Sequence, residues 1–124
     1  MSPFATFFHS IRISRGVTQK DIAELAGYEQ SYVSAMENGL KGPPNEEFLE
    51  KISRVLLLST EERERLENAA KLSQRKFMLP INTPESIYVL VNELMNQINS
   101  IHPTQVEVIR AVLKIPVNQH AHQS

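Results

Sequence analysis

Residues 18–39, TQKDIAELAGYEQSYVSAMENG, constrain the fold of this chain more than any other stretch. Their pattern predicts two short helices joined by a tight turn. Ala23 is small enough for the second helix to cross close over the first, and Gly27 stands where the first helix ends and the backbone needs a positive φ. Four apolar residues supply the contacts between the two helices: Ile22, Ala26, Val33 and Met36. This is the spacing of a helix-turn-helix.

Residues on both sides extend this motif. At Arg12, Gly16, Thr18, Gln19, Ala23, Gly27, Val33, Ser34, Glu37, Asn38 and Gly39, the chain resembles the phage-repressor and Cro-like helix-turn-helix regulators, the XRE family. The resemblance covers roughly residues 7–66 and implies a lambda-repressor-like DNA-binding domain. It also implies that the second helix of the motif enters the DNA major groove. A helical hairpin with no nucleic-acid role is the alternative.

Helical periodicity predicts three further helices, which complete a five-helix domain over residues 1–72. The first covers residues 3–14, with Pro3 in its opening turn and a cluster of phenylalanines facing inward. Asn45 is a good N-cap for a helix that extends to about Leu57. Ser59 or Thr60 caps the fifth helix. We therefore expect an all-α fold, with this domain followed by a carboxy-terminal helical hairpin.

The resemblance assigns roles to individual residues. The outward face of the recognition helix, about residues 29–38, is expected to contact DNA bases through Gln30, Ser31, Ser34 and Ala35, with Tyr32 near its edge. A glutamine at position 30 can make paired hydrogen bonds to adenine N6 and N7. Contacts to the DNA backbone are expected from Thr18, Gln19, Lys20, Asn38, Lys41 and Arg15. Arg12 and Glu37 are expected to form a partly buried structural pair, although Arg12 could reach a phosphate instead.

The charge balance gives DNA binding no global support, because the net charge of the chain is −1. Residues 1–43 contain four basic side chains and four carboxylates, so this segment is neutral as well. If Arg12 and Glu37 neutralise each other, the remaining basic side chains are left near the phosphates: Arg15, Lys20 and Lys41. We therefore expect modest affinity and a real dependence on dimerisation.

The carboxy-terminal third has a different pattern. Residues 73–83 predict a connector, residues 84–115 a helical unit for dimerisation or interaction, and residues 116–124 a disordered tail. Thr83 is expected to cap a helix that extends to about Ile101, and a second helix is expected over Thr104 to Leu113. Both carry apolar stripes, to which we assign the dimer interface: Ile87, Leu90, Val91, Leu94, Met95, Ile98, Val106, Ile109, Val112 and Leu113.

Two helices alone cannot bury both stripes. We favour pairing with a second copy of the chain, because family members bind paired half-sites about one DNA turn apart. Packing onto the DNA-binding domain and recognition of a different protein are the alternatives.

Composition excludes several kinds of chemistry. The chain of 124 residues contains no cysteine, which excludes disulfides, thiolate nucleophiles and Cys-ligated zinc. It also lacks a Gly-rich phosphate loop, an HExxH motif and a nucleophile elbow. We therefore expect no enzymatic activity, no catalytic residue, no metal site and no cofactor. No segment approaches 18 consecutive apolar residues, so we expect no membrane association and a cytoplasmic location.

These observations predict a sequence-specific transcriptional regulator that binds double-stranded DNA as a homodimer. The resemblance makes repression, by occlusion of a promoter, the expected outcome. Two alternatives stay open. One is an antitoxin-type autorepressor that neutralises a partner protein through its carboxy-terminal helices. The other is a protein-interaction module that has lost DNA binding.

Overall fold

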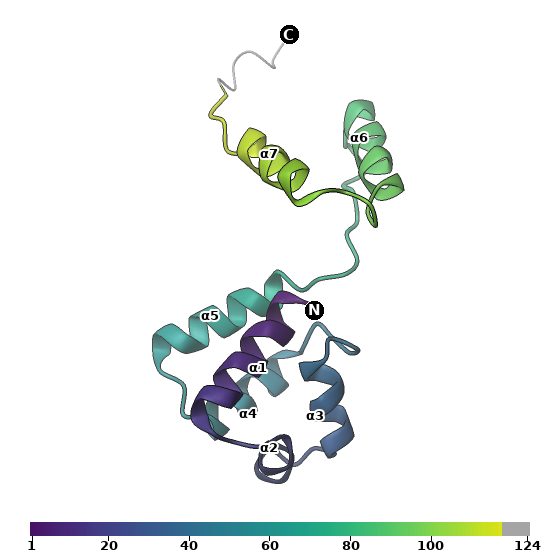
Figure 1. Ribbon diagram of the computed structural model, residues 1–124. Coiled ribbons are helices and arrows are strands. Elements are labelled where there is room, and N and C mark those ends of the chain that lie inside the picture. Colours follow the sequence, from purple (N-terminus) through teal and green to yellow (C-terminus); the bar gives the residue numbers. More distant parts are fainter. Residues whose placement is uncertain (118–124) are drawn as a thin grey trace. The chain divides into compact units, whose positions relative to one another are not determined.

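The computed structural model describes residues 1–117, and within them it contains seven α-helices and no strand (Figure 1). The all-α fold class is thereby confirmed. The chain divides into two compact units, Met1–Met78, called unit 1, and a second that begins at Leu79, called unit 2. The expected disordered tail falls largely on residues 118–124, which lie outside the described residues. The helices are α1 (Pro3–Arg15), α2 (Gln19–Ala26), α3 (Gln30–Glu37), α4 (Glu46–Val55), α5 (Thr60–Lys71), α6 (Glu85–Asn96) and α7 (Pro103–Leu113).

Local capping interactions set the boundaries of the helices in unit 1. Thr18 and Asp21 form a reciprocal capping box at the beginning of α2, because each side chain accepts a hydrogen bond from the other residue's backbone N–H. The Asn45 side chain caps α4 by accepting from the N–H of Phe48. Ser59 caps α5 in the same way. Each of these residues lies at the helix start that the sequence predicts.

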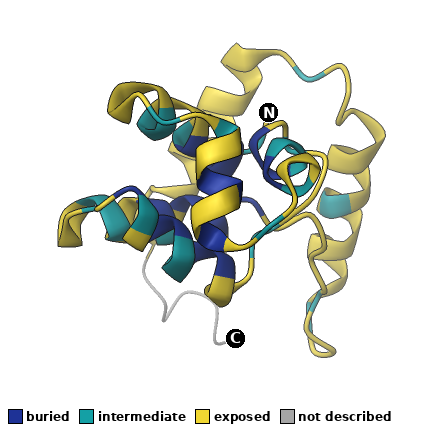
Figure 2. Cartoon of the chain, turned by 90° about the horizontal axis from the view of Figure 1, so that it is seen from below, coloured by how far each residue is buried: buried dark blue, intermediate teal, exposed yellow. Residues whose placement is uncertain are grey.

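An aromatic cluster forms the centre of unit 1. The rings of Phe4, Phe8 and Phe48 are fully buried, with centroids 5.6–6.1 Å apart. Val33 and Met36 of α3 join this core, so α3 is fixed from its inner side. Figure 2 shows the buried faces of these helices turned toward one another. Full burial of each such side chain contributes roughly 1.5–3 kcal/mol to the free energy of folding.

In unit 2 the boundaries of α6 differ from those that the sequence predicts. Pro84 has an extended backbone with φ −62° and ψ 150°, so the helix begins at Glu85. The expectation that Thr83 is the N-cap is wrong, because Pro84 occupies the N-cap position and no side chain caps this helix end. The Thr83 hydroxyl donates to the carbonyl of Pro80 at 2.7 Å. The helix also ends at Asn96, well before Ile101. Turns follow it, in a stretch rich in asparagine and serine, which are poor helix formers.

The last helix begins one residue earlier than expected. Pro103 is the first residue of α7, where its missing N–H costs nothing. His102 is the N-cap, and its ring nitrogen accepts a hydrogen bond from the N–H of Thr104 at 3.1 Å. The His-Pro pair therefore begins α7 as well as separating it from α6.

Unit 2 leaves its apolar side chains largely uncovered. No residue of α6 or α7 is buried, and Leu90 and Val112 are 58% and 57% exposed. A groove of about 370 Å³ lies between the two helices. Its lining is mostly apolar: Leu90, Val91, Glu93, Leu94, Gln97, Ile101, Gln105, Ile109 and Leu113. None of the helices over residues 1–117 is long and apolar enough to cross a membrane.

Candidate nucleic-acid interface

A turn at Gly27 joins α2 to α3. The backbone N–H groups of Gly27 and Tyr28 both donate to the carbonyl of Ala23 at 2.9 Å, which closes the end of α2. Gly27 has φ +80°, a conformation that L side chains rarely adopt. Ala23 is 4% exposed, so the two helices meet over its small side chain. This turn aims the beginning of α3 away from the core.

Arg12 of α1 and Glu37 of α3 lie together in a bidentate ion pair. Arg12 Nε is 2.5 Å from Glu37 Oε1, and Arg12 Nη2 is 2.9 Å from Glu37 Oε2. The remaining terminal nitrogen of Arg12, Nη1, donates to the carbonyl of Val17 at 2.9 Å. All three nitrogens of the Arg12 guanidinium group therefore make hydrogen bonds within unit 1. Two parallel N–H···O bonds fix both distance and orientation, so the pair sets the angle between α1 and α3.

Glu37 accepts hydrogen bonds from two further side chains. His9 Nδ1 lies 3.1 Å and Gln19 Nε2 lies 3.0 Å from Glu37 Oε2. Burial alone would raise the pKa of Glu37, but the hydrogen bonds from Arg12, His9 and Gln19 lower it from its ordinary value of 4.5 to about 2. The carboxylate is therefore ionised, although it is only 3% exposed. It links α1, α2 and α3 at one point.

The residues expected to contact DNA bases divide into two groups. Gln30 and Ser31 are exposed at the beginning of α3, whereas Ser34 and Ala35 are half-buried. Tyr32 is also half-buried, and its ring stacks on Tyr28 with centroids 5.1 Å apart and meets Phe48 edge-on at 5.7 Å. Much of the Tyr32 ring therefore supports α3 from its flank.

The residues expected to hold the DNA backbone lie around the beginning of α2 and the end of α3. Thr18 caps α2, and Lys20 is exposed in its first turn. The amide of Gln19 donates to Glu37, which leaves the backbone N–H groups of Gln19 and Lys20 as the donors at this helix end.

At the other end of α3, Asn38 Nδ2 lies 3.4 Å from Ser34 Oγ, and Lys41 Nζ lies 5.2 Å from the ring centroid of Tyr32. Arg15 lies apart from this group. Its guanidinium pairs with Glu62 of α5 at 2.6 Å.

Sequence reasoning assigned no role to His9 and did not foresee the bond from Gln19 to Glu37. A signal for His9 was present, since His9 and Arg12 are three residues apart and therefore share one face of α1. No such local signal exists for Gln19, because the bond joins residues 18 positions apart.

Comparison with known proteins identifies the family. Residues 3–66 match the family described as a helix-turn-helix domain. The HTH-type transcriptional regulator SinR of Bacillus subtilis (strain 168) is 42% identical over 48 residues, 39% of this chain and 43% of that protein. SinR of Bacillus licheniformis gives the same values. The chain thus spans less than half the length of these curated relatives, and no solved structure matches it. Because the helix-turn-helix family matches residues 3–66, which are more than half of the chain, the chain belongs to the XRE-like helix-turn-helix family.

Proposed function

We propose that this chain is a sequence-specific DNA-binding transcriptional regulator that inserts α3 into the major groove. The observation that carries the proposal is the position of Gln30 and Ser31. Both are exposed polar residues at the beginning of a helix whose other side is fixed by Val33, Met36 and the buried ion pair. The amide of Gln30 suits adenine N6 and N7, and Ser31 can donate to or accept from a base edge.

Backbone contacts position α3 on the duplex. The free N–H groups at the beginning of α2 hold one phosphate, with Lys20 beside them. Asn38 and Lys41 contact the backbone at the other end of α3. The Arg12–Glu37 pair acts indirectly, by keeping α3 at the angle that both sets of contacts need.

We propose that the chain binds as a homodimer through α6 and α7. Their apolar side chains are uncovered within unit 2, and a second copy would cover them with an equivalent face. Two linked domains could then occupy paired half-sites. A dimer seated across a promoter would occlude it, so we propose repression as the outcome.

The experiment that tests the function is binding to the duplex upstream of its own gene and to a scrambled duplex, at several salt concentrations. A specific regulator prefers its own duplex by about 10³-fold or more and loses affinity steeply as salt rises. The Gln30→Ala and Ser31→Ala variants should each change the preferred sequence. If both variants discriminate between DNA sequences as the parent chain does, these residues do not contact the bases.

A partner protein is the second candidate occupant of the groove between α6 and α7, as in an antitoxin-type autorepressor. The same mostly apolar lining favours it. Sedimentation of the purified chain distinguishes a homodimer from a complex with a partner protein, because only the homodimer forms from the chain alone. A monomer in that measurement, together with a stable complex on co-purification, would favour the partner protein.

A further inference from the structure

Most basic side chains of unit 1 are neutralised by carboxylates. Six lie within salt-bridge distance of one: Arg12, Arg15, Lys51, Arg54, Arg63 and Arg65. Among the described residues, the lysines and arginines of unit 1 without such a partner are Lys20, Lys41, Lys71, Arg75 and Lys76. Within unit 1, these five are the lysines and arginines left to attract a polyanion, in a chain whose net charge is −1.

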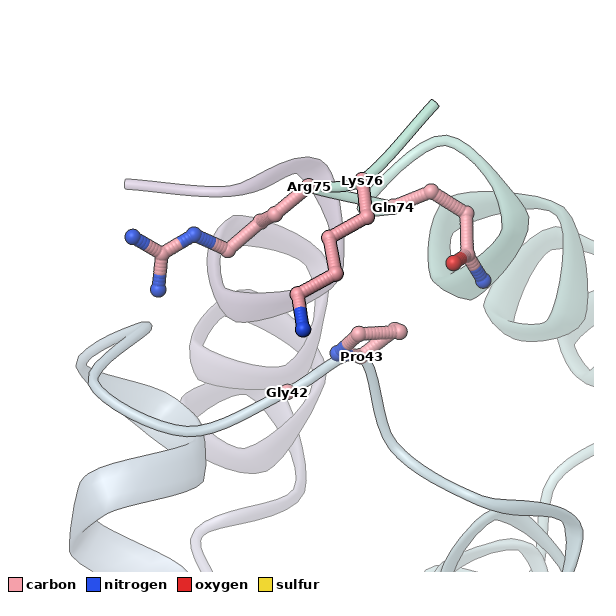
Figure 3. Close-up of a pocket in the computed structure, with 5 residues that line it drawn as sticks. All are labelled: Gly42, Pro43, Gln74, Arg75 and Lys76. Carbon is pink, nitrogen blue, oxygen red and sulfur yellow. The ribbon is translucent and has the colours of Figure 1, made fainter. Parts of the chain in front are cut away.

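Three of the five lie around one loop. A hollow of about 470 Å³ is lined by Gly42, Pro43, Gln74, Arg75 and Lys76. Figure 3 shows the Lys76 side chain directed toward the Gly42–Pro43 segment, with the Arg75 side chain extended beside it. A smaller hollow next to it is lined by Lys41 as well as Arg75. Neither lining includes a carboxylate, so the local charge is strongly positive. We call Lys41, Arg75 and Lys76 the basic cluster.

Buried hydrogen bonds hold the chain just before residues 74–76. The Ser73 hydroxyl donates to the carbonyl of Ala69 at 2.7 Å and accepts from the N–H of Phe4 at 2.9 Å. Ser73 is only 5% exposed. It therefore fixes the exit of α5 against the beginning of α1, and Arg75 and Lys76 follow directly.

The other side of the cluster is attached to the recognition helix. The N–H groups of Leu40 and Lys41 both donate to the carbonyl of Ala35, at 2.9 and 3.3 Å. The Lys41 ammonium lies over the ring of Tyr32, which also belongs to α3. Lys41 thus connects the basic cluster to the carboxy-terminal end of α3 within unit 1.

We propose that Lys41, Arg75 and Lys76 hold phosphates of the DNA backbone that flank the segment contacted by α3. The inference rests on the proposed function and adds contacts that the helix-turn-helix motif does not contain. A guanidinium group offers two parallel N–H donors to phosphate oxygens, and the two ammonium groups add positive charge. The three side chains are exposed, and the lining of the 470 Å³ hollow contains no buried polar group that could enclose a small anion. Such an open site suits a continuous polyanion, which releases counterions when it binds.

The test compares two double variants with the same change in net charge. Arg75→Gln/Lys76→Gln removes two cations of the cluster, and Arg63→Gln/Arg65→Gln removes two cations of α5 that are paired with carboxylates. Affinity for the duplex that the parent chain prefers is measured between 50 and 200 mM salt. The slope of log K against log salt should be about two units shallower for the cluster variant than for the parent chain. Over this range of salt, the variant should therefore lose roughly tenfold less affinity than the parent chain does. The control variant should keep the parental slope.

Phosphate-ethylation interference locates the contacts. With the parent chain, ethylation of the outermost phosphates should weaken binding, and with the cluster variant this effect should disappear while the inner positions stay sensitive. Equal slopes for the two double variants, or an unchanged interference pattern, would overturn the inference and leave sequence-dependent binding through Gln30 intact. Failure of the parent chain to bind any duplex would instead overturn the proposed function, and this inference with it. Thermal unfolding of both variants should match the parent, since all four positions are outside the core.

Discussion

The carboxylate of Glu37 lies where three helices meet, since His9 and Arg12 belong to α1, Gln19 to α2 and Glu37 itself to α3. Its four hydrogen bonds compensate for its burial, which by itself favours the protonated form. Removing the charge would leave the Arg12 guanidinium partly buried without its partner. Such a loss costs more than the loss of a surface ion pair.

The stability of unit 1 should therefore depend on pH in the acid range. The pKa of Glu37 is about 2 in the folded state and near 4.5 when unfolded, so the stabilisation is complete above about pH 4.5 and is lost as the pH falls toward 2. The depression corresponds to roughly 3 kcal/mol. Chemical denaturation of the parent chain and of Glu37→Gln at several pH values measures it. The variant should be less stable at pH 7 and should lose this part of the pH dependence; an equally steep acid dependence in the variant would assign it to other groups.

At the scale of the helix pair, Gly27 determines how α3 leaves α2. An added Cβ would meet no atom within 4 Å, so a substitution there is opposed by backbone conformation and not by lack of space. Gly27→Ala should lower the free energy of unfolding by about 1–2 kcal/mol. Gly27→Asn should lower it less, because asparagine tolerates a positive φ better. Thermal unfolding compares the two, and equal losses would indicate that the turn relaxes.

The core allows a second prediction at this scale. Phe8 is fully buried and contacts the rings of Phe4 and Phe48. Phe8→Ala should cost about 3–5 kcal/mol, through lost burial and the cavity left behind. Phe77→Ala is the matched control, because Phe77 is 84% exposed, and it should be nearly neutral in urea denaturation. A small effect of Phe8→Ala would mean that the neighbouring rings close the cavity.

Interactions between residues close together in the chain could largely be predicted from the sequence, whereas interactions between distant residues could not. Thr18, Asn45 and Ser59 could be recognised as caps because a cap acts within three residues of itself. The position of Arg75 and Lys76 beside Gly42 could not, since it depends on the hydrogen bond between Ser73 and Phe4, 69 residues apart. Thr83 failed as a cap because α6 begins one residue later than expected, at Glu85, which places Pro84 at the N-cap position. The connector thus contributes side chains to the candidate interface that its sequence pattern did not reveal.

At the scale of the whole molecule, the proposed homodimer depends on the apolar side chains of unit 2. Leu94→Glu would place a carboxylate in the apolar groove between α6 and α7, and the proposed homodimer should dissociate because the charge would be buried without a partner. Asn92→Glu adds the same charge at an exposed position of α6 and should leave the dimer intact. Sedimentation equilibrium measures both variants. If Leu94→Glu has the mass of the parent chain, the groove is not the contact between copies.

Gln30 and Ser31 are exposed, and within residues 1–117 neither side chain makes a hydrogen bond to the rest of the protein. Val33, Met36 and the Arg12–Glu37 pair fix α3 from its opposite side, and the Tyr32 ring supports it from its flank. Changes at these two positions therefore carry almost no folding cost. If Gln30 and Ser31 contact the bases as proposed, a lineage of such proteins could acquire new target sequences one substitution at a time. A library randomised at both positions should then yield many folded members with altered operator preference.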